Sequence, residues 1–316
     1  MADTGSRIKA CLIDCAVKVL QETDSCKKAE MTLECLHMWE SNQIILDADD
    51  KTRVNGEEYA GPPDTPGRNP QVKLVSPSQL PKRGKGGSLA SRQALLHSLV
   101  HIECCAIDLA WDIIARFGRH PEYREILPKE FFHDFVVVAA DEARHFTELR
   151  KRLKDMGMEY GDLAAHDGLW ESALETKDSL PARLAIEHCT HEARGLDILP
   201  LTIQRFRNGG DDGSAALLES VIYPEEITHC AAGVKWLKYL HNVAFKHFNE
   251  NKNEDGKLPK WVLEAVQYDT VEKWFHALVR KHFHGLLKPP FNDEARAKAG
   301  FVPAWYLPLS VADCPD

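Results

Sequence analysis

The chain has 316 residues, of which 44% are hydrophobic and 28% are charged. This composition excludes a mainly disordered protein, and the length is sufficient for one large domain with additions or for two small ones. The 39 Lys and Arg residues are outnumbered by 48 Asp and Glu residues, which gives a net charge of −9. An acidic balance of this size is not typical of a general nucleic-acid-binding or membrane-binding surface.

The nine cysteines form no Cys-x-x-Cys motif, so zinc-ribbon and thioredoxin-like classes lack their usual support. Most of them lie in apolar helical patterns, where a reduced thiol acts as a small hydrophobic group. The N-terminal sequence has no signal-peptide pattern, and no apolar run is long enough to span a membrane. We therefore expect a soluble, cytoplasmic protein.

The N-terminal third of the chain combines helices with a long irregular segment. Apolar residues at helical spacing predict two helices within residues 6–41. Residues 50–90 are rich in Pro and Gly and contain the basic cluster "PKRGKGG". Such a stretch is incompatible with regular helix, and a loop of this length is either a linker or functional.

From Ser88 onward the sequence is helical in pattern. The four longest predicted helices span residues 89–117, 129–156, 180–207 and 214–250. Pro224 lies inside the last of them and predicts a kink or local break. Residues 259–287 predict one further amphipathic helix, followed by a mostly irregular tail that ends with aromatic residues.

No alternating stretch is long enough to form a sheet, so we predict an all-α fold. Its four predicted parts are an N-terminal helical pair at 1–49, a connecting loop at 50–88, an antiparallel four-helix bundle at 89–252, and a C-terminal helix and tail at 253–316 packed on the bundle.

Each of the four long helices places an acid in the middle of its apolar face. In the first, Glu103 lies in line with Val100 and Ile107, at steps of three and four residues. The four acids are Glu103, Glu142, Glu192 and Glu226. The second and fourth helices add a histidine three residues further on, and these are His145 and His229.

A buried carboxylate without a partner costs several kcal/mol, and four that converge would repel one another unless cations lay between them. Carboxylate and imidazole ligands suit iron or manganese better than a metal that prefers thiolates. Two single Glu residues together with two Glu-x-x-His motifs form the ligand set of di-iron carboxylate bundles. The acids on the apolar faces therefore predict a site for two metal ions.

The two halves of the predicted bundle resemble each other. The segment "HIECCAIDL" aligns with "HEARGLDIL", so that Glu103 matches Glu192 and Asp108 matches Asp197. The motif "DEARHF" on its own favours a solvated, charged helix surface. Two matched Glu-x-x-His motifs, each preceded by a matched Glu helix, are far more specific and favour the metal site.

These motifs resemble the ferritin-like superfamily of di-iron carboxylate proteins, in which "DEARH" is typical of oxygenases. More narrowly, the chain resembles an uncharacterised ferritin-like family through "RQALLHSLVHIECCAIDLAWDIIARF", "EARGLDILP" and "HGLLKPPFNDEARAKAGF". The resemblance implies a ferritin-like bundle that binds two iron ions, with manganese or a mixed pair as alternatives. The implied metal ligands are Glu103, Glu142, His145, Glu192, Glu226 and His229.

The resemblance also implies residues that support these ligands. Asp141 and Glu225 each precede the Glu of a Glu-x-x-His motif and are expected to accept the outer N–H of a ligand imidazole. For Glu225, an ordinary surface acid is an equally good interpretation. Arg144 lies within the first motif, but the second motif has Thr228 at the matching position, so any role of Arg144 is not doubled. His188 is interpreted as an extra ligand, a hydrogen-bond partner of the site or, preferably, a structural histidine. No catalytic residue beyond the cluster is identified.

The leading hypothesis for the function is a di-iron, or iron and manganese, oxidoreductase that uses O₂ or peroxide on an unidentified substrate. The substrate would be a small molecule or a modified nucleotide, with an electron donor as a further partner and no membrane partner. The first alternative is metal handling, ferroxidase or peroxide-scavenging activity without an organic substrate. A second is a tRNA-modifying, hydroxylase-like enzyme, for which the acidic net charge is unfavourable. A third is a scaffold that keeps the bundle without metal.

Overall fold

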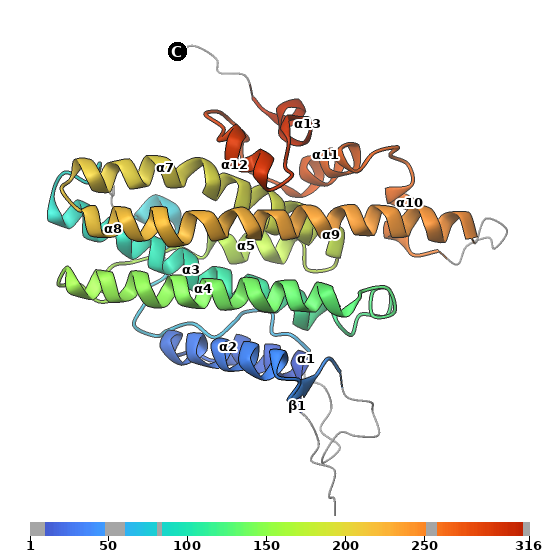
Figure 1. Cartoon of the computed structure of the whole chain (residues 1–316), viewed down its shortest axis with the longest axis horizontal. Coiled ribbons are helices and arrows are strands. Elements are labelled where there is room, and N and C mark those ends of the chain that lie inside the picture. Colours follow the sequence, from blue (N-terminus) through green and yellow to red (C-terminus); the bar gives the residue numbers. More distant parts are fainter. Residues whose placement is uncertain (1–9, 48–60, 81–83, 251–257, 312–316) are drawn as a thin grey trace, which may run out of the picture. The chain divides into compact units, whose positions relative to one another are not determined.

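The computed structural model describes residues 10–47, 61–80, 84–250 and 258–311. The regular secondary structure of these residues is almost entirely helical, which confirms the all-α prediction (Figure 1). A correction concerns the expected lack of any sheet, because β1 (Ala10–Cys11) and β2 (Ile44–Ile45) pair in parallel over two residues each. None of the helices in these ranges is long and apolar enough to cross a membrane. Residues 50–60 and 81–83 of the predicted loop at 50–88 lie outside the described residues.

The chain divides into two compact units. Unit 1 comprises Met1–Lys73 and Val100–Glu148, and unit 2 comprises Leu74–Leu99 and Leu149–Asp316. Helices α3 (Leu89–Phe117) and α4 (Lys129–Asp155) contribute residues to both units. The bounds of these two helices confirm the predicted ranges 89–117 and 129–156 to within one residue. The predicted division of the chain into four parts stays a prediction.

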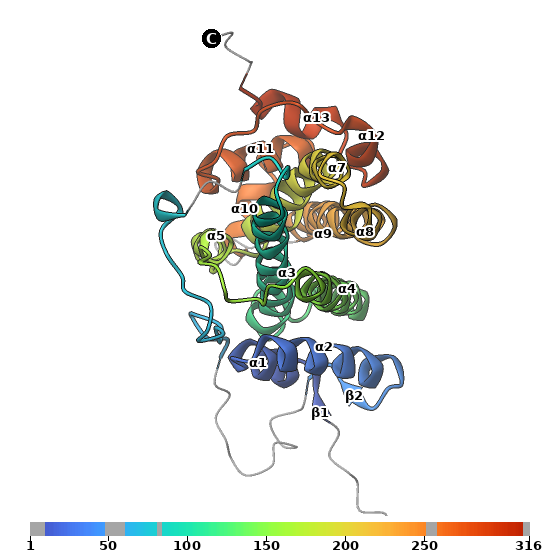
Figure 2. The same cartoon turned by 90° about the vertical axis from the view of Figure 1, so that its left-hand side faces the viewer.

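Unit 1 places an N-terminal helix pair against α3. Helices α1 (Leu12–Gln21) and α2 (Ser25–Glu40) contact each other, and Figure 2 shows them side by side. Asp24 starts α2, because its side chain accepts hydrogen bonds from two backbone N–H groups of the first turn. The indole Nε1 of Trp111 in α3 donates a hydrogen bond of 2.9 Å to Thr32 Oγ1 in α2. These contacts fix α2 along the part of α3 that follows Glu103.

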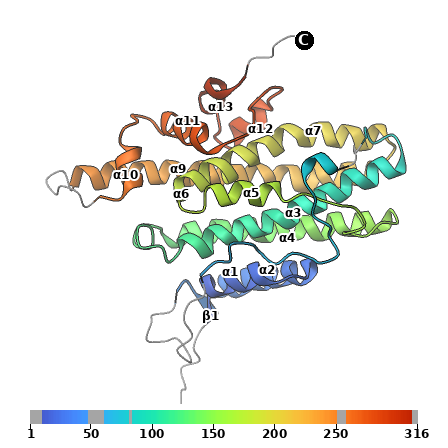
Figure 3. The same ribbon diagram turned by 180° about the vertical axis from the view of Figure 1, so that it is seen from behind.

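Unit 2 contains the remaining helices. Their bounds are α5 Gly168–Glu175, α6 Leu180–Ala185, α7 Glu192–Asn208, α8 Asp212–Leu217, α9 Tyr223–Glu250, α10 Lys260–Ala265, α11 Val271–His282, α12 Asp293–Lys298 and α13 Pro303–Tyr306. Two short 3₁₀ turns lie at Pro77–Gln79 and Leu307–Leu309. Helices α7 and α9 run side by side (Figures 1 and 3), and α12 contacts both of them.

Two π-helical turns interrupt the helices that carry the acids of unit 2. Ile186–His191 joins α6 to α7, and Leu218–Ile222 joins α8 to α9. The second turn lies directly before Pro224, which has no N–H to donate to an α-helical ladder. The break predicted at Pro224 is therefore confirmed. The turn before α7 contains no proline, and no residue pattern predicted it.

Two predictions for the C-terminal region are wrong. The single helix expected at 259–287 is divided into α10 and α11, because Thr270 caps a new helix by accepting a hydrogen bond from the backbone N–H of Lys273 at 3.3 Å. The apolar spacing continues across this turn, which explains the error. The tail, expected to be mostly irregular, forms α12 and α13.

The close approach of α9 to the first π-turn generates a stability prediction. A Cβ atom on Gly233 of α9 would lie 1.9 Å from the backbone oxygen of His188, whereas a Cβ on Gly195 of α7 would meet only Glu226 Oε2, at 3.9 Å. We expect Gly233→Ala to lower the free energy of unfolding by about 3 kcal/mol or more through overpacking. Gly195→Ala is the matched control and should be neutral or stabilising, since Ala favours helix. Urea denaturation of the metal-free protein measures both; equal stability of the two variants would contradict the packing.

Candidate metal centre

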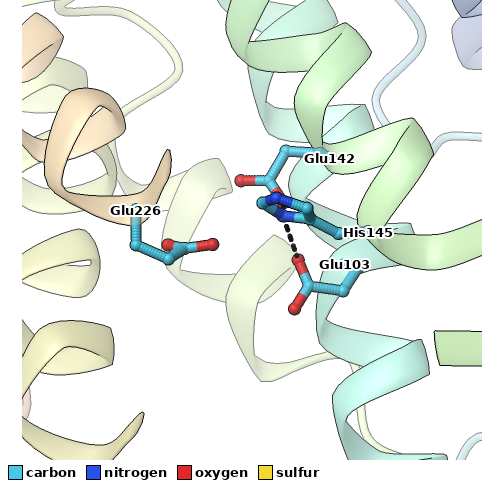
Figure 4. A group of neighbouring side chains, drawn as sticks. All are labelled: Glu103, Glu142, His145 and Glu226. Carbon is cyan, nitrogen blue, oxygen red and sulfur yellow. Dashed lines mark hydrogen bonds and ion pairs between the residues drawn. The ribbon is translucent and has the colours of Figure 1, made fainter. Parts of the chain in front are cut away.

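The first cluster of metal-binding side chains lies within unit 1. Helix α3 supplies Glu103, and helix α4 supplies Glu142 and His145, which lie three residues apart on one face. The Nδ1 atom of His145 is 3.4 Å from Glu103 Oε2 and 3.3 Å from Glu142 Oε2. Each residue offers a ligand atom, and these atoms lie within 4.8 Å of one another. Figure 4 shows the three side chains and also labels Glu226 of unit 2.

Burial gives this cluster its electrostatic character. Glu103, Glu142 and His145 are 5%, 2% and 1% exposed. Burial and the charge of Glu142 raise the pKa of Glu103 to about 8. Burial alone would lower the pKa of His145, but its hydrogen bonds to Glu103 and Glu142 outweigh that effect and raise it to about 12. The two carboxylates therefore attract one positive charge to this position, and the imidazolium form of His145 can supply it.

The second cluster lies within unit 2 and uses the same residue types. Glu192 is the first residue of α7, directly after a π-turn, and Glu226 and His229 lie in the first two turns of α9. Each of the three residues offers a ligand atom within 4.8 Å of the others. The Nδ1 atom of His229 is 3.9 Å from Glu226 Oε1. Glu226 and His229 are buried, and Glu192 is partly exposed.

The structure thus brings the six predicted residues together as two groups of three. Each group contains one Glu from one helix and a Glu-x-x-His motif from another. The carboxylate oxygens and imidazole nitrogens are those that iron and manganese accept. The coarse prediction of a buried Glu and His cluster that could hold metal is confirmed, and the metal's identity stays a prediction.

The side chains expected to support the ligands have partners of their own. Arg144 forms an ion pair with Asp141 one turn earlier on α4. Glu225 is half-buried, and its backbone oxygen accepts a hydrogen bond of 2.7 Å from Thr228 Oγ1. His188 is buried in the π-turn before α7. Their roles beside the metal ligands stay predictions.

One polar group beside the second cluster was missed from the sequence. Ser172 Oγ in α5 donates a hydrogen bond of 2.7 Å to Glu187 Oε1 and lies 3.2 Å from His191 Nε2. Glu187 and His191 belong to the π-turn that leads into Glu192, and Glu187 is buried. At regular α-helical spacing, Glu187 and His191 do not fall on the apolar face of the predicted helix. Their proximity to the cluster could have been predicted only if the π-turn had been predicted first.

The buried thiols near the clusters are packing groups, as predicted. Cys104, Cys189 and Cys230 are buried and form no disulfide. Burial raises the pKa of all three thiols, and the negative charge of Glu192 adds to this effect at Cys189 and Cys230. Because the thiolate is the metal-binding form, these neutral side chains are poor ligands.

The family described as "Protein of unknown function (DUF455)" matches residues 21–307 of this chain. The chain is also similar to an uncharacterized protein of Haemophilus influenzae, with 32% identity over 232 residues that cover 72% of this chain and 71% of that protein. No solved structure matches the chain. An uncharacterised family was expected and is confirmed, whereas neither comparison names the ferritin-like superfamily.

The electrostatics of the first cluster generate a prediction about pH. In metal-free protein, we expect the His145 imidazole to stay protonated at pH 8, because its pKa is raised to about 12. The stabilisation from this raised pKa is complete below the unfolded value of about 6.5 and is lost as pH rises toward 12. Nitrogen-15 NMR of the imidazole measures the protonation state.

Glu142→Gln provides the comparison for this measurement. It removes one of the two negative charges around His145, so the pKa of the imidazole should fall by at least about one unit. A wild-type His145 that titrates near pH 6.5 would contradict the arrangement of the cluster.

Proposed function

We propose that the two clusters form one centre for two metal ions in a ferritin-like four-helix bundle. The chain belongs to the DUF455 family of proteins of unknown function. The protein would then be an iron-dependent oxidoreductase, with manganese or a mixed pair of ions as the alternative. Its oxidant would be O₂ or peroxide. Glu103, Glu142, His145, Glu192, Glu226 and His229 would hold the ions.

The observation that carries the proposal is the repetition of one ligand group. Each unit offers one Glu and one Glu-x-x-His from two helices, with the ligand atoms within 4.8 Å of one another. The four carboxylates and two imidazoles of the two groups would together hold two iron or manganese ions.

The donor chemistry of the site fits the proposed ions. The ligand atoms are carboxylate oxygens and imidazole nitrogens, while the neighbouring thiols have raised pKa values. Burial, together with repulsion from the like charge of Glu142, raises the pKa of Glu103 to about 8. A divalent cation would remove this repulsion and displace the proton.

The chain's own residues would position the ions and shield them. When bound, the ions would supply the electrons and Lewis acidity for oxidation of a substrate. Apolar residues close in sequence to the proposed ligands are buried, among them Phe135, Val138, Leu196 and Ile222, and they would help to keep water away from the ions. The Arg144–Asp141 ion pair restrains the turn of α4 that carries Glu142 and His145. These features favour a shielded redox centre, and they identify no substrate.

Metal analysis tests the proposal. We expect about two ions per chain in protein expressed with added iron, as in the di-iron carboxylate bundles. Glu142→Ala and Glu226→Ala should each reduce bound iron by half or more, since each removes a carboxylate from one cluster. Glu148→Ala is the control, because Glu148 is an exposed acid on the same helix as Glu142.

Two results would contradict the proposal. Wild-type protein without bound iron or manganese would rule out the metal centre. A Glu148→Ala variant that loses as much iron as Glu142→Ala would show that the loss does not arise at the cluster. If iron-loaded protein consumes peroxide rapidly and needs no organic substrate, the metal-handling alternative replaces the oxidoreductase.

A further inference from the structure

Two aspartates occupy matched places beside the proposed metal ligands. Asp108 is buried, and Asp197 is partly exposed. Asp108 follows Glu103 by five residues on α3, and Asp197 follows Glu192 by five residues on α7. Neither aspartate belongs to a metal-binding cluster. Each is paired with a basic side chain from a segment outside the helices that carry the proposed ligands.

In unit 1, Asp108 connects α3 to the N-terminal part of the chain. It is fully buried, and Oδ1 lies 2.5 Å from Nζ of Lys28 in α2. The other carboxylate oxygen pairs with Arg68 of the segment that follows the N-terminal helices. Lys28 Nζ also donates a hydrogen bond of 3.0 Å to the backbone oxygen of Gly67. One carboxylate therefore fastens both α2 and the 67–68 segment to the helix that carries Glu103.

In unit 2, Asp197 connects α7 to the C-terminal part of the chain. Arg296 of α12 donates from Nε to Asp197 Oδ1 at 2.8 Å and from Nη2 to Oδ2 at 2.6 Å. The guanidinium is buried and lies over three aromatic rings, with its Cζ 4.3 Å from the ring centroid of Tyr306, 4.7 Å from that of Phe291 and 5.5 Å from that of Phe301. This enclosure fixes the plane of the guanidinium and, through it, the rotation of α7.

Asn292 extends the same connection to α9. Its backbone N–H donates to Asp197 Oδ1 at 2.8 Å, and its side-chain Nδ2 donates to the backbone oxygen of Leu196 at 3.1 Å and to Tyr223 Oη at 2.7 Å. Tyr223 is the first residue of α9, three residues before Glu226. The C-terminal segment therefore contacts both helices of the second cluster close to their proposed ligands (Figure 3).

A buried ion pair contributes little net stability, because desolvation of the two charges offsets their attraction. What it does provide is geometry, since an unpaired buried charge is so costly that each partner stays in place. A displacement of well under 1 Å at a ligand changes metal affinity, and residues that orient ligands typically alter affinity by 10–100-fold when mutated. The two aspartates lie close enough in sequence to their glutamates to control the positions of those glutamates.

We propose that Asp108 and Asp197 are positioning residues for the metal centre. Each couples a segment from one end of the chain to a helix that carries a ligand, so the N-terminal and C-terminal segments are functional parts of the centre. This inference rests on the proposed metal centre. Because coupling between binding and conformation is reciprocal, bound metal should in turn stabilise the attachment of both segments.

The test is a titration of full-length, metal-free protein with Mn²⁺ by calorimetry. We expect Asp197→Asn and Asp108→Asn each to weaken Mn²⁺ binding by roughly 10-fold. The rise in melting temperature produced by saturating Mn²⁺ should shrink in both variants. The electron paramagnetic resonance spectrum of the bound Mn²⁺ should also change, because the ligand geometry is altered.

Asp211→Asn is the matched control in unit 2. Asp211 is buried and paired with Arg152 at 2.7 Å, but it lies beyond the end of α7 opposite to Glu192. Its substitution should lower the melting temperature equally with and without Mn²⁺ and leave the affinity and the spectrum unchanged. If Asp197→Asn does not fold, Arg296→Lys replaces it as the test variant. A lysine keeps the positive charge but cannot pair with both carboxylate oxygens of Asp197 as the guanidinium does. Arg296→Lys should weaken Mn²⁺ binding by less than the roughly 10-fold expected for Asp197→Asn.

The outcomes separate this inference from the function on which it rests. Wild-type protein that binds neither Mn²⁺ nor iron would overturn both. The positioning role alone would be overturned if Asp108→Asn and Asp197→Asn both bind Mn²⁺ within twofold of the wild-type affinity. Where Asp197→Asn does not fold, Arg296→Lys takes its place in this comparison. The same holds if Asp211→Asn weakens binding as much as Asp197→Asn does, because the effect would then be one of general stability.

Discussion

A carboxylate inside a helical protein requires a positive charge nearby, and this requirement organises the molecule described here. The buried and partly buried acids satisfy it in two ways. Asp108, Asp112 and Asp197 are paired with Lys or Arg side chains, while Glu103 and Glu142 contact the imidazole of His145. A Lys or Arg is permanently charged and serves structure. An imidazolium can lose its proton, and its nitrogen is then free to bind a metal ion, so the second arrangement is suited to metal binding.

The sequence was sufficient to predict the helices whose apolar faces are regular. The ranges of α3 and α4 were predicted to within one residue, and the acids at the centre of their faces are buried. The matched places of Asp108 and Asp197 in the two halves were also visible in the sequence. Their partners had no local signal, because Lys28 lies 80 residues and Arg296 lies 99 residues away along the chain.

The remaining differences have physical causes that residue patterns do not report. The periodicity of apolar residues assumes 3.6 residues per turn, so it passes over a π-turn unless a proline marks it, as Pro224 does before α9. It also passes over the end of α10, since the apolar spacing continues across a capped turn. The group of Ser172, Glu187 and His191 went unnoticed for the first of these reasons.

The two π-turns have a consequence for how the chain changes in evolution. A π-turn holds one residue more than the α-helical turn that it replaces. Ile186–His191 and Leu218–Ile222 each precede a helix that begins at or near a proposed ligand. Insertion or loss of one residue at these points changes the upstream register by about 100° and leaves the downstream helix intact. Diverging relatives are therefore free to vary the surroundings of the acids on the N-terminal side while inheriting Glu192, Glu226 and His229 unaltered.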